Sequence, residues 1–487
     1  MSKFSVYLRT LLDKSGEPIA RIAEKAGVER TSIHKALKDE RILSYVALKR
    51  LIQYLELTLP EIRELNQYYE MLLQGEDIYE IQESICELLS DISQLHFSTN
   101  AQTGPAILKE GMTIQEGLIY GKPQVEKGIR YILYQEILAG ESCELCMFLS
   151  QECALSDEML RLWEQGQRLQ VRQLVSFQPN HSGEGTNLAN FQLLQQIIPM
   201  ALMSFGQYFA YYYFEDAGSP VNIDPLPYFI VTPHYLIRMN QKMSIAQIQS
   251  SAEVIELYRK HFVQVQEECQ ILITYANDLI EVLGDYMNST TVDEYYTIML
   301  QPCFGRYYTK EIIRKYFHGE EPWKGQVVDL ADKRMGMLRG MKNNYYTIFS
   351  ESGLVQFAEK GVIVDLPSEY TTPLDIPDRL AMLKSFRKDL ESGAVIGCIV
   401  DDGKLSIPPY LTMTCDPKFG VHFYATRGFV RGAYTCNLHI QGANIGKSFC
   451  EFIKSMPNSK FVYPKDKTRA VVDRLISELE EGAVCSE

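Results

Sequence analysis

The chain has 487 residues, a length that predicts two to four domains, each large enough to bury its own core. With 46% hydrophobic and 23% charged residues, its composition excludes a disordered, collagen-like or coiled-coil-only protein. The net charge of −14 argues against nucleic-acid binding by the whole chain. However, residues 1–50 hold 11 Lys and Arg against 6 Asp and Glu, which leaves −19 for the rest, so positive charge is concentrated in a small N-terminal segment.

Cysteine usage and hydropathy indicate the cellular compartment. Eleven cysteines are scattered along the chain with no signal peptide ahead of them, which favours reduced thiols in a cytoplasmic protein. The uncharged stretch at 185–214 is longer than the roughly 20 residues of a membrane helix, but it contains Pro199 and several Asn and Gln residues. We therefore expect a buried helix followed by a buried strand, and no membrane partner.

The first 60 residues predict a bundle of short helices. Apolar residues at helical spacing predict a first amphipathic helix: Phe4, Leu8, Leu11 and Leu12. Pro18 suits the start of a second helix, and Gly27 suits the turn after it because glycine tolerates positive φ. Ala23, Gly27, Val28 and Ile33 then form the core of a helix-turn-helix, in which a small residue is needed where the two helices cross.

The third helix is expected from about residue 29 or 30 to Lys38, with Ile33, Ala36 and Leu37 facing inward. A fourth helix follows, and Thr58 is the candidate N-cap of a fifth. The outward face of the third helix carries Arg30, Thr31, Ser32, His34, Lys35 and Lys38. A helix of this size enters the major groove of DNA, where Arg can bond guanine O6 and N7 and Thr can contact a thymine methyl.

Residues 3–66 resemble the phage-repressor-like (XRE-type) helix-turn-helix domain of bacterial transcription regulators. The resemblance implies that Arg30, Thr31, His34 and Lys35 contact base edges or the DNA backbone, and that Ser32 and Lys38 contact phosphates. Ile19 stands where the family usually has Gln or Thr, so one phosphate contact of the family is in doubt. The alternative is a small helical bundle used for protein contacts.

Residues 73–110 are expected to form a helical linker with a possible dimerisation helix. Apolar residues follow the a and d positions of a heptad: Ile78, Ile81, Ile85, Leu88 and Ile92. The flanking positions are acidic, which does little to favour pairing of two copies. The sequence therefore leaves two alternatives, a homodimer seam or a helix that lies on its own sensor domain. A homodimer is expected by some route, since two recognition helices read both half-sites of an operator.

The rest of the chain alternates helices and strands, which predicts a multidomain protein: an all-α domain at 1–72, an α/β sensor-like domain at 111–277, a helical connector at 278–350 and a C-terminal α/β domain at 351–487. The passages IQSSAEVIELYRKHF and IQGANIGKSFCEFI begin alike at Ile248 and Ile440. A degenerate tandem repeat with mixed sheets is therefore possible.

The order of elements at 111–277 is similar to one half of a phospholipase-D-like fold, which also occurs as a non-catalytic sensor domain. Catalysis in that fold needs an H-x-K pair, with His as nucleophile and Lys binding phosphate. The residue two after each of the eight histidines is never Lys, as with Leu236 after His234 and Tyr424 after His422. We therefore expect no catalytic residue and no enzyme.

Two motifs have the wrong pattern for a cofactor. GANIGKS at 442–448 has three residues between its glycines, whereas a P-loop needs four. Cys143 and Cys146 have the spacing of a zinc pair, but no second pair accompanies them, so buried structural thiols are expected and no metal. Neither motif predicts a cofactor.

The aromatic run at 207–214 is a candidate ligand wall through Tyr208, Tyr211 and Tyr213, because aromatic side chains suit an apolar or planar ligand. The sequence as a whole predicts a cytoplasmic, dimeric transcription regulator that binds double-stranded operator DNA and an unidentified small-molecule, peptide or protein effector. The alternatives are a protein-interaction scaffold, such as an antitoxin or phage-defence control protein, and an enzyme with a DNA-targeting module.

Overall fold

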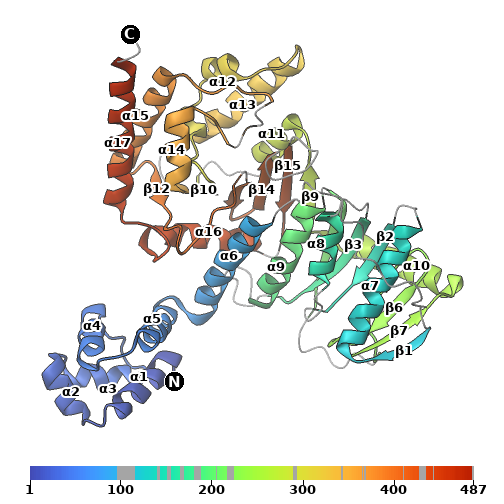
Figure 1. Cartoon of the computed structure of the whole chain (residues 1–487), viewed down its shortest axis with the longest axis horizontal. Helices are drawn as coiled ribbons and strands as arrows, with labels where there is room; N and C mark the ends of the chain where they lie inside the picture. Colours follow the sequence, from blue (N-terminus) through green and yellow to red (C-terminus); the bar gives the residue numbers. More distant parts are fainter. Residues whose placement is uncertain are drawn as a thin grey trace. The chain divides into compact units, whose positions relative to one another are not determined.

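The structure, a computed structural model, describes residues 1–95, 116–139, 143–150, 155–164, 169–179, 188–204, 206–215, 224–288, 293–341, 344–364, 366, 369–409, 411–426, 435–442 and 444–484. The chain divides into two compact units, Met1–Glu83 and Ser84–Glu487 (Figure 1). The expected domain boundary at residues 110–111 falls outside the described residues. No described helix has both the length and the apolar character needed to cross a membrane.

The first unit is all-helical, as predicted. Its helices are α1 (Lys3–Lys14), α2 (Ile19–Ala26), α3 (Arg30–Ala36), α4 (Tyr45–Tyr54), α5 (Leu59–Gln74) and the start of α6 (Glu76–Gln94). Thr58 caps α5 in a capping box with Glu61, so the predicted N-cap is confirmed. Lys14 and the Thr58 hydroxyl and N–H all donate to the Glu61 carboxylate, which lowers its pKa to about 2.

The predicted helix-turn-helix core is confirmed. Ala23, Val28 and Ile33 are buried in one cluster with Phe4 and Leu48, on the neighbouring helices α1 and α4. Gly27 ends α2 with φ +64°, a left-handed conformation that other residues adopt only at a cost. The third helix ends at Ala36, two residues earlier than expected, and Lys38 lies in the turn after it.

The second unit contains two mixed sheets. Elements of the first part are β1 (Gly117–Tyr120), α7 (Lys122–Leu138), β2 (Cys143–Phe148), α8 (Ser156–Glu164), β3 (Leu169–Phe177), α9 (Leu188–Met203), β4 (Tyr208–Phe214), β5 (Tyr228–Val231), β6 (Leu236–Met239), β7 (Ile245–Gln249), α10 (Ala252–Glu268) and β8 (Gln270–Ile271). Elements of the second part are β9 (Ile273–Ala276), α11 (Leu279–Asn288), β10 (Tyr295–Ile298), α12 (Lys310–Tyr316), α13 (Trp323–Gly340), β11 (Tyr345–Phe349), α14 (Glu351–Lys360), α15 (Ile376–Ser392), β12 (Ile396–Ile399), β13 (Leu411–Asp416), β14 (Gly420–Thr426), β15 (Thr435–Ile440), α16 (Ile445–Ser455) and α17 (Lys465–Val484). Two short 3₁₀ turns lie at Gly305–Tyr307 and Met456–Asn458.

The two sheets repeat one topology. The first has the order β1-β7-β6-β5-β2-β3-β4, with β8 added at its edge, and the second has the order β9-β15-β14-β13-β10-β11-β12. In each sheet the last three strands of that order pair in parallel and the others pair antiparallel. We call these two parts, residues 116–271 and 273–484, the first and second repeat. The predicted mixed-sheet α/β architecture is therefore confirmed, and the two parts share one strand order.

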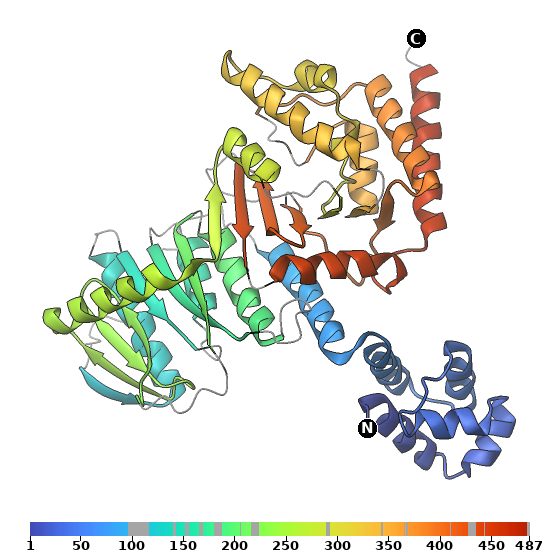
Figure 2. The ribbon, with the colours of Figure 1, turned by 180° about the vertical axis from the view of Figure 1, so that it is seen from behind.

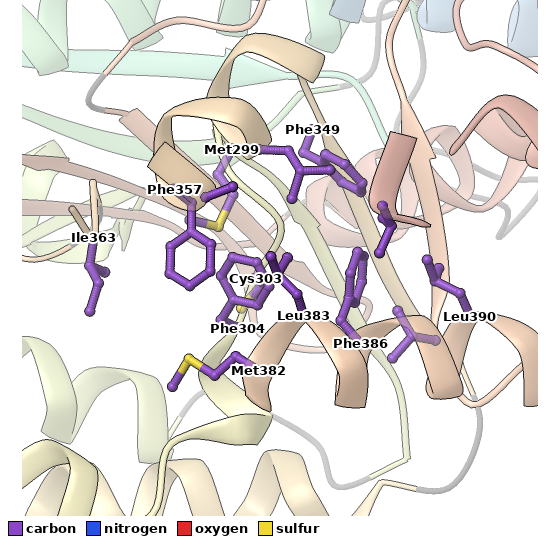
Figure 3. Close-up of a cluster of buried hydrophobic side chains, with 14 of the residues drawn as sticks. Met299, Cys303, Phe304, Phe349, Phe357, Ile363, Met382, Leu383, Phe386 and Leu390 are labelled. Atoms are coloured by element: carbon purple, nitrogen blue, oxygen red, sulfur yellow. The ribbon is translucent and has the colours of Figure 1, made fainter. Parts of the chain in front are cut away.

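Helices cover both faces of each sheet (Figures 1 and 2). In the first repeat α7, α8 and α9 cover one face and α10 covers the other, where Phe229 contacts Tyr258 of α10 at 5.3 Å between ring centroids. In the second repeat α11 and α13 cover one face with α14 and α15, and α16 covers the opposite face. Figure 3 shows the core on the α14 and α15 side, where Phe304, Phe357 and Phe386 pack together.

One extended segment joins the two repeats. β8 pairs with β4 at the edge of the first sheet, and β9 pairs with β15 at the edge of the second. Between them, the Leu272 N–H donates to the Ala210 carbonyl and the Leu272 carbonyl accepts from Gln441 N–H, both at 2.9 Å. Backbone bonds therefore connect both sheets through one residue.

The region 278–350 is not only a helical connector. It contains three helices, but it also supplies β10 and β11, which pair in parallel inside the second sheet. The tetrapeptide YYTI occurs in both strands and lies in register, with the ring centroids of Tyr295 and Tyr345 4.9 Å apart and those of Tyr296 and Tyr346 5.0 Å apart. Both strands are buried on both faces, so their sequences lack the alternation that marks a half-exposed strand.

Most of the apolar row of α6 is buried within the chain. Ile78 is 42% exposed, but Ile81, Ile85, Leu88 and Ile92 are buried within the single chain. In the larger unit, Gln195 of α9 donates to the Ser84 carbonyl at 3.1 Å, so this end of α6 lies on its own chain. An apolar row that is already buried cannot also pair with a second copy. This burial favours the alternative in which the helix lies on its own chain.

Candidate functional site

The solvent-facing side of α3 carries most of the predicted DNA-contacting side chains. Arg30, Thr31 and Lys35 are exposed, and Ser32 and His34 are half-buried, whereas Ile33 and Ala36 face the core. This division follows from helical spacing, because the inward residues lie three positions apart. The sequence prediction of which residues face outward is confirmed, and the helix presents cationic and hydroxyl groups along one face.

Two local contacts orient polar groups at the start of α3. Arg30 Nε donates to His34 Nε2 at 3.3 Å across one helical turn, which leaves the Arg30 terminal nitrogens pointing to solvent. The Ser32 hydroxyl donates to Glu29 Oε2 at 3.3 Å, so a phosphate at Ser32 would replace this bond. Arg30 is therefore positioned for a bidentate contact, whereas Ser32 is already engaged.

The lysines of this surface differ in their surroundings. Lys35 forms no ion pair with any described residue, and Lys38 pairs with Glu40 at 3.9 Å where both side chains are exposed. An exposed pair of this kind contributes at most about 1 kcal/mol, so a phosphate can displace it. Both ammonium groups are thus accessible to an anionic partner.

A groove beside α3 adds basic groups that sequence reasoning did not select. It lies between the starts of α3 and α4 and includes Arg41, Ser44 and Arg50. Arg50 Nη1 donates to the Gly27 carbonyl at 2.9 Å, which ties α4 to the turn of the helix-turn-helix. The signal in the sequence was a basic residue ahead of the predicted fourth helix, Arg41, and another within it, Arg50.

The three tyrosines of β4 that were candidates for a ligand wall do not share one face of the sheet. Tyr208 lies on the face covered by α8, where its ring is 6.3 Å from Trp163 and its hydroxyl donates to Gln173 at 2.8 Å. Tyr211 and Tyr213 lie on the opposite face, because side chains alternate along a strand. The three side chains cannot line one pocket, and none lines the large apolar cavity described below.

The remaining motifs occupy structural positions. Residues 442–448 follow β15 and open α16 as predicted, with Ala443 outside the described residues. Cys143 and Cys146 are buried in β2, and burial raises the pKa of the Cys143 thiol to about 12. No three described His, Cys, Asp or Glu side chains are grouped as a metal site would require.

His234, one of the histidines tested for the H-x-K pattern, is held by a buried carboxylate. Its Nδ1 lies 2.7 Å from Glu136 Oε2, its backbone N–H donates to Glu136 Oε1 at 2.9 Å, and Thr232 also donates to this carboxylate. Glu136 thus fixes the loop between β5 and β6 against α7. Leu236, rather than a lysine, stands two residues after His234.

An apolar cavity lies in the second repeat. It encloses about 130 Å³ between the sheet and helices α11, α12 and α13, and aliphatic and aromatic side chains dominate its lining. Two of the lining residues, Cys303 and Ile363, also belong to the core in Figure 3. One fully charged side chain, Arg334 of α13, is among the described residues that line this cavity.

A row of polar residues crosses the sheet beneath this cavity. His439, His422, Thr414, Thr297 and Thr347 are consecutive cross-strand neighbours on β15, β14, β13, β10 and β11. The rings of His422 and His439 stack at 3.9 Å, and Asn437 Nδ2 donates to His422 Nδ1 at 3.0 Å. Burial lowers the pKa of His422 well below its usual value, and the neighbouring His439 and Arg334 lower it further.

The comparisons with known proteins were made against families, curated proteins and solved structures. No family model and no curated protein matches the sequence. Similar solved structures include TrmBL2, an archaeal chromatin protein (12% identity, 44% of this chain and 72% of that chain, TM-score 0.24), phosphatidylserine synthase of Haemophilus influenzae Rd KW20 (9%, 76% and 96%, 0.22) and polyphosphate kinase of Porphyromonas gingivalis (10%, 80% and 59%, 0.23). These TM-scores are too low to support an argument about this chain.

Proposed function

We propose that the protein is a DNA-binding transcription regulator. The observation that carries the proposal is the α2-turn-α3 motif. Its second helix is short, presents a cationic exposed face, and follows a turn in which Gly27 has a left-handed conformation. Helices of this kind insert into the major groove and read base edges with Arg and polar side chains. Arg30 and Lys35 are the groups we propose for base or backbone contact, with Thr31 and His34 beside them.

The charge distribution supports a single DNA-contacting surface. Residues 1–50 have a positive balance, while the remainder carries −19. An acidic bulk repels phosphate, so it confines nucleic acid to the basic unit. We propose Arg41 and Arg50, at the groove beside α3, as additional phosphate contacts.

We further propose that the protein acts as a homodimer and that the larger unit binds an effector. One short recognition helix contacts few base pairs, whereas two helices read two half-sites. An effector regulates DNA binding only if it binds the DNA-competent and incompetent forms with different affinity, a coupling of about 1–3 kcal/mol. The buried face of α6 means that the contact between copies is to be sought elsewhere.

Fluorescence anisotropy across a salt series tests this function. The full chain is titrated onto a duplex from the region upstream of its own coding sequence and onto a scrambled duplex of the same length. Arg30→Ala and Lys35→Ala should each weaken specific binding, by roughly tenfold for a base contact, because such a contact contributes about 1–3 kcal/mol. Arg63→Ala, which removes an exposed charge from α5, is the control and should bind like the wild type.

The salt slope separates base contacts from phosphate contacts. A variant that loses a phosphate contact should bind both duplexes more weakly and reduce the slope by about one. Equal, weak binding by the wild type and both variants would contradict the proposal. Such a result would instead favour the alternative in which the helical unit contacts a protein. Co-purification would then identify that protein.

A further inference from the structure

Arg334, a buried cation, lines the cavity of the second repeat and forms no ion pair with any described residue. Arg334 is 3% exposed, and its Nη1 has no hydrogen-bond partner. Its guanidinium lies 5.2 Å from the centre of the Tyr286 ring and 5.4 Å from that of Tyr295, which compensates the charge only in part.

A buried charge without a counter-ion is costly, because burial removes its hydration and weak contacts replace only part of it. Native interiors therefore pair such charges or place them where a ligand supplies the opposite charge. Arg334 is one of the residues that line the cavity, so a ligand in the cavity can reach it. The unpaired Nη1 of Arg334 thus indicates that the cavity binds a ligand that supplies the opposite charge.

A second hydrogen-bond donor lines the same cavity. Thr414 of β13 is 5% exposed, its Oγ1 has no hydrogen-bond partner, and it also lines the cavity. Arg can only donate hydrogen bonds, and a hydroxyl can donate one. Two unsatisfied donors that line one cavity favour a ligand with an acceptor, and the positive charge of Arg334 favours an anionic acceptor.

The other residues that line the cavity restrict the size and the polarity of the uncharged part of the ligand, which we call its body. Leu279 and Val282 of α11, Val327 and Ala331 of α13, and Leu374 surround the cavity with aliphatic surface. Its volume of about 130 Å³ is close to that of an engineered apolar cavity of about 150 Å³ that holds benzene. A phosphate or a sugar would leave polar groups unpaired against this surface, whereas a small apolar body would not.

We propose that this cavity binds a small carboxylic acid with an apolar body of about the size of a benzene ring. The carboxylate accepts hydrogen bonds from Arg334 and Thr414, and the apolar body fills the space against α11 and α13. The single charge of a carboxylate matches the single lining cation. This inference depends only on the second repeat and stands whether or not the helical unit binds DNA.

Isothermal titration of the full chain with benzoate tests the proposal. Benzyl alcohol has the same apolar body without the charge, and acetate has the charge without the body. Benzoate should bind at least about tenfold more tightly than either, because a charge-assisted bond contributes about 1.5–3 kcal/mol. Benzyl alcohol binding as tightly as benzoate would overturn the proposal, as would the absence of binding by benzoate, phenylacetate and 3-methylbutanoate alike.

Arg334→Met and Lys333→Met form a matched pair on α13. Each removes one positive charge, but Lys333 is exposed and Arg334 lines the cavity. Arg334→Met should weaken benzoate binding at least about tenfold, whereas Lys333→Met should leave it unchanged. Without ligand, Arg334→Met should unfold at no lower temperature than the wild type, because it removes a buried charge that has no counter-ion among the described residues. A lower unfolding temperature with unchanged benzoate affinity would show that Arg334 is structural and overturn the proposal.

Ala331→Leu gives an independent test that leaves Arg334 in place. Ala331 lies on α13 at the cavity, so three added carbons reduce the space for the apolar body. This variant should lose benzoate binding while keeping both donors. Benzoate binding equal to that of the wild type would place the ligand elsewhere and overturn the proposal, even if Arg334→Met did not fold.

Discussion

The two sheets of the larger unit share a strand order. They differ in the row of cross-strand neighbours on the sheet face that the connecting helices cover. In the first repeat the cross-strand row from β7 to β4 is Ile248, Ile237, Ile230, Met147, Gln173 and Ala210. In the second repeat the row from β15 to β12 is His439, His422, Thr414, Thr297, Thr347 and Gly397.

The difference shows that one topology can support either a packed core or a polar interior. The apolar row gains stability from burial, and its one amide, Gln173, is satisfied by Tyr208. The polar row lies beneath the cavity, and two of its hydroxyls, on Thr297 and Thr414, have no partner. Such a row costs stability, which is common where a protein keeps groups for binding.

The chain offers a separate reporter for each repeat. Trp163 lies in α8 of the first repeat and Trp323 lies in α13 of the second, and the sequence has two tryptophans in all. A Trp323→Phe background therefore reports unfolding of the first repeat, and a Trp163→Phe background reports unfolding of the second. Each prediction below is measured by tryptophan fluorescence of the full chain in one of these backgrounds.

The largest effect is expected from a polar residue in the apolar row. Ile237→Thr should lower the free energy of unfolding of the first repeat by roughly 2–4 kcal/mol, because it loses buried carbon and buries a hydroxyl. The urea midpoint in the Trp323→Phe background measures the change. Leu118→Thr on β1 is the control, since Leu118 is exposed and its replacement should matter by less than about 0.5 kcal/mol. Equal shifts in the two variants would mean that the apolar row is not what stabilises this sheet.

A pH-dependent effect is expected in the polar row. The pKa of His422 is lowered in the folded protein by burial, and further by His439 and Arg334, so below its ordinary pKa of 6.5 the unfolded chain binds more protons than the folded chain. The stability of the second repeat should therefore be full above pH 6.5 and fall as the pH drops, by up to about 1.4 kcal/mol per pH unit for this group.

His422→Gln should make this pH dependence shallower between pH 7.5 and 5.5, whatever its effect on stability at pH 7.5. Urea midpoints in the Trp163→Phe background measure the slope. His318→Gln, at an exposed histidine of the same repeat, should leave the slope as in the wild type. Parallel slopes in the wild type and His422→Gln would show that His422 is protonated to the same extent in both states.

The smallest effect is expected from single hydroxyls of the polar row. Thr297→Val removes a buried oxygen without a partner and should stabilise the second repeat by about 1 kcal/mol. Thr347→Val should destabilise it by about 1–3 kcal/mol, because the Thr347 hydroxyl accepts the Cys303 N–H at 3.0 Å and the variant leaves that donor unpaired. Urea midpoints measure both, and a change of the same sign in both would contradict this account of the row.

Features that depend on local spacing were predictable from the sequence. The helix-turn-helix core at Ala23, Gly27, Val28 and Ile33 and the cap at Thr58 each depend on residues a few positions apart. The outward face of α3 was predictable for the same reason. The shared Ile-Gln start at Ile248 and Ile440 likewise indicated the repeat, because both mark the end of a strand before a helix.

Features that depend on distant partners were not predictable. The YYTI strands were missed because strands buried on both faces do not alternate. The heptad of α6 predicted an apolar stripe but could not say what covers it. Arg334 lies at helical spacing from Val327, Ala331 and Leu338, so the sequence indicated a cation on the buried face of this helix. The sequence could not indicate that Nη1 of this cation has no hydrogen-bond partner.

The sequence by itself determined the helical N-terminal unit, the cationic outer face of its third helix and the α/β character of the rest, because these depend on the periodicity of neighbouring residues. Only the tertiary structure decided that two sheets share one topology, that a polar row crosses the second, and that a buried cation without an ion pair among the described residues lines an apolar cavity. The physical reason is that strand order, burial and charge compensation depend on residues that are far apart in the chain and meet only in the fold.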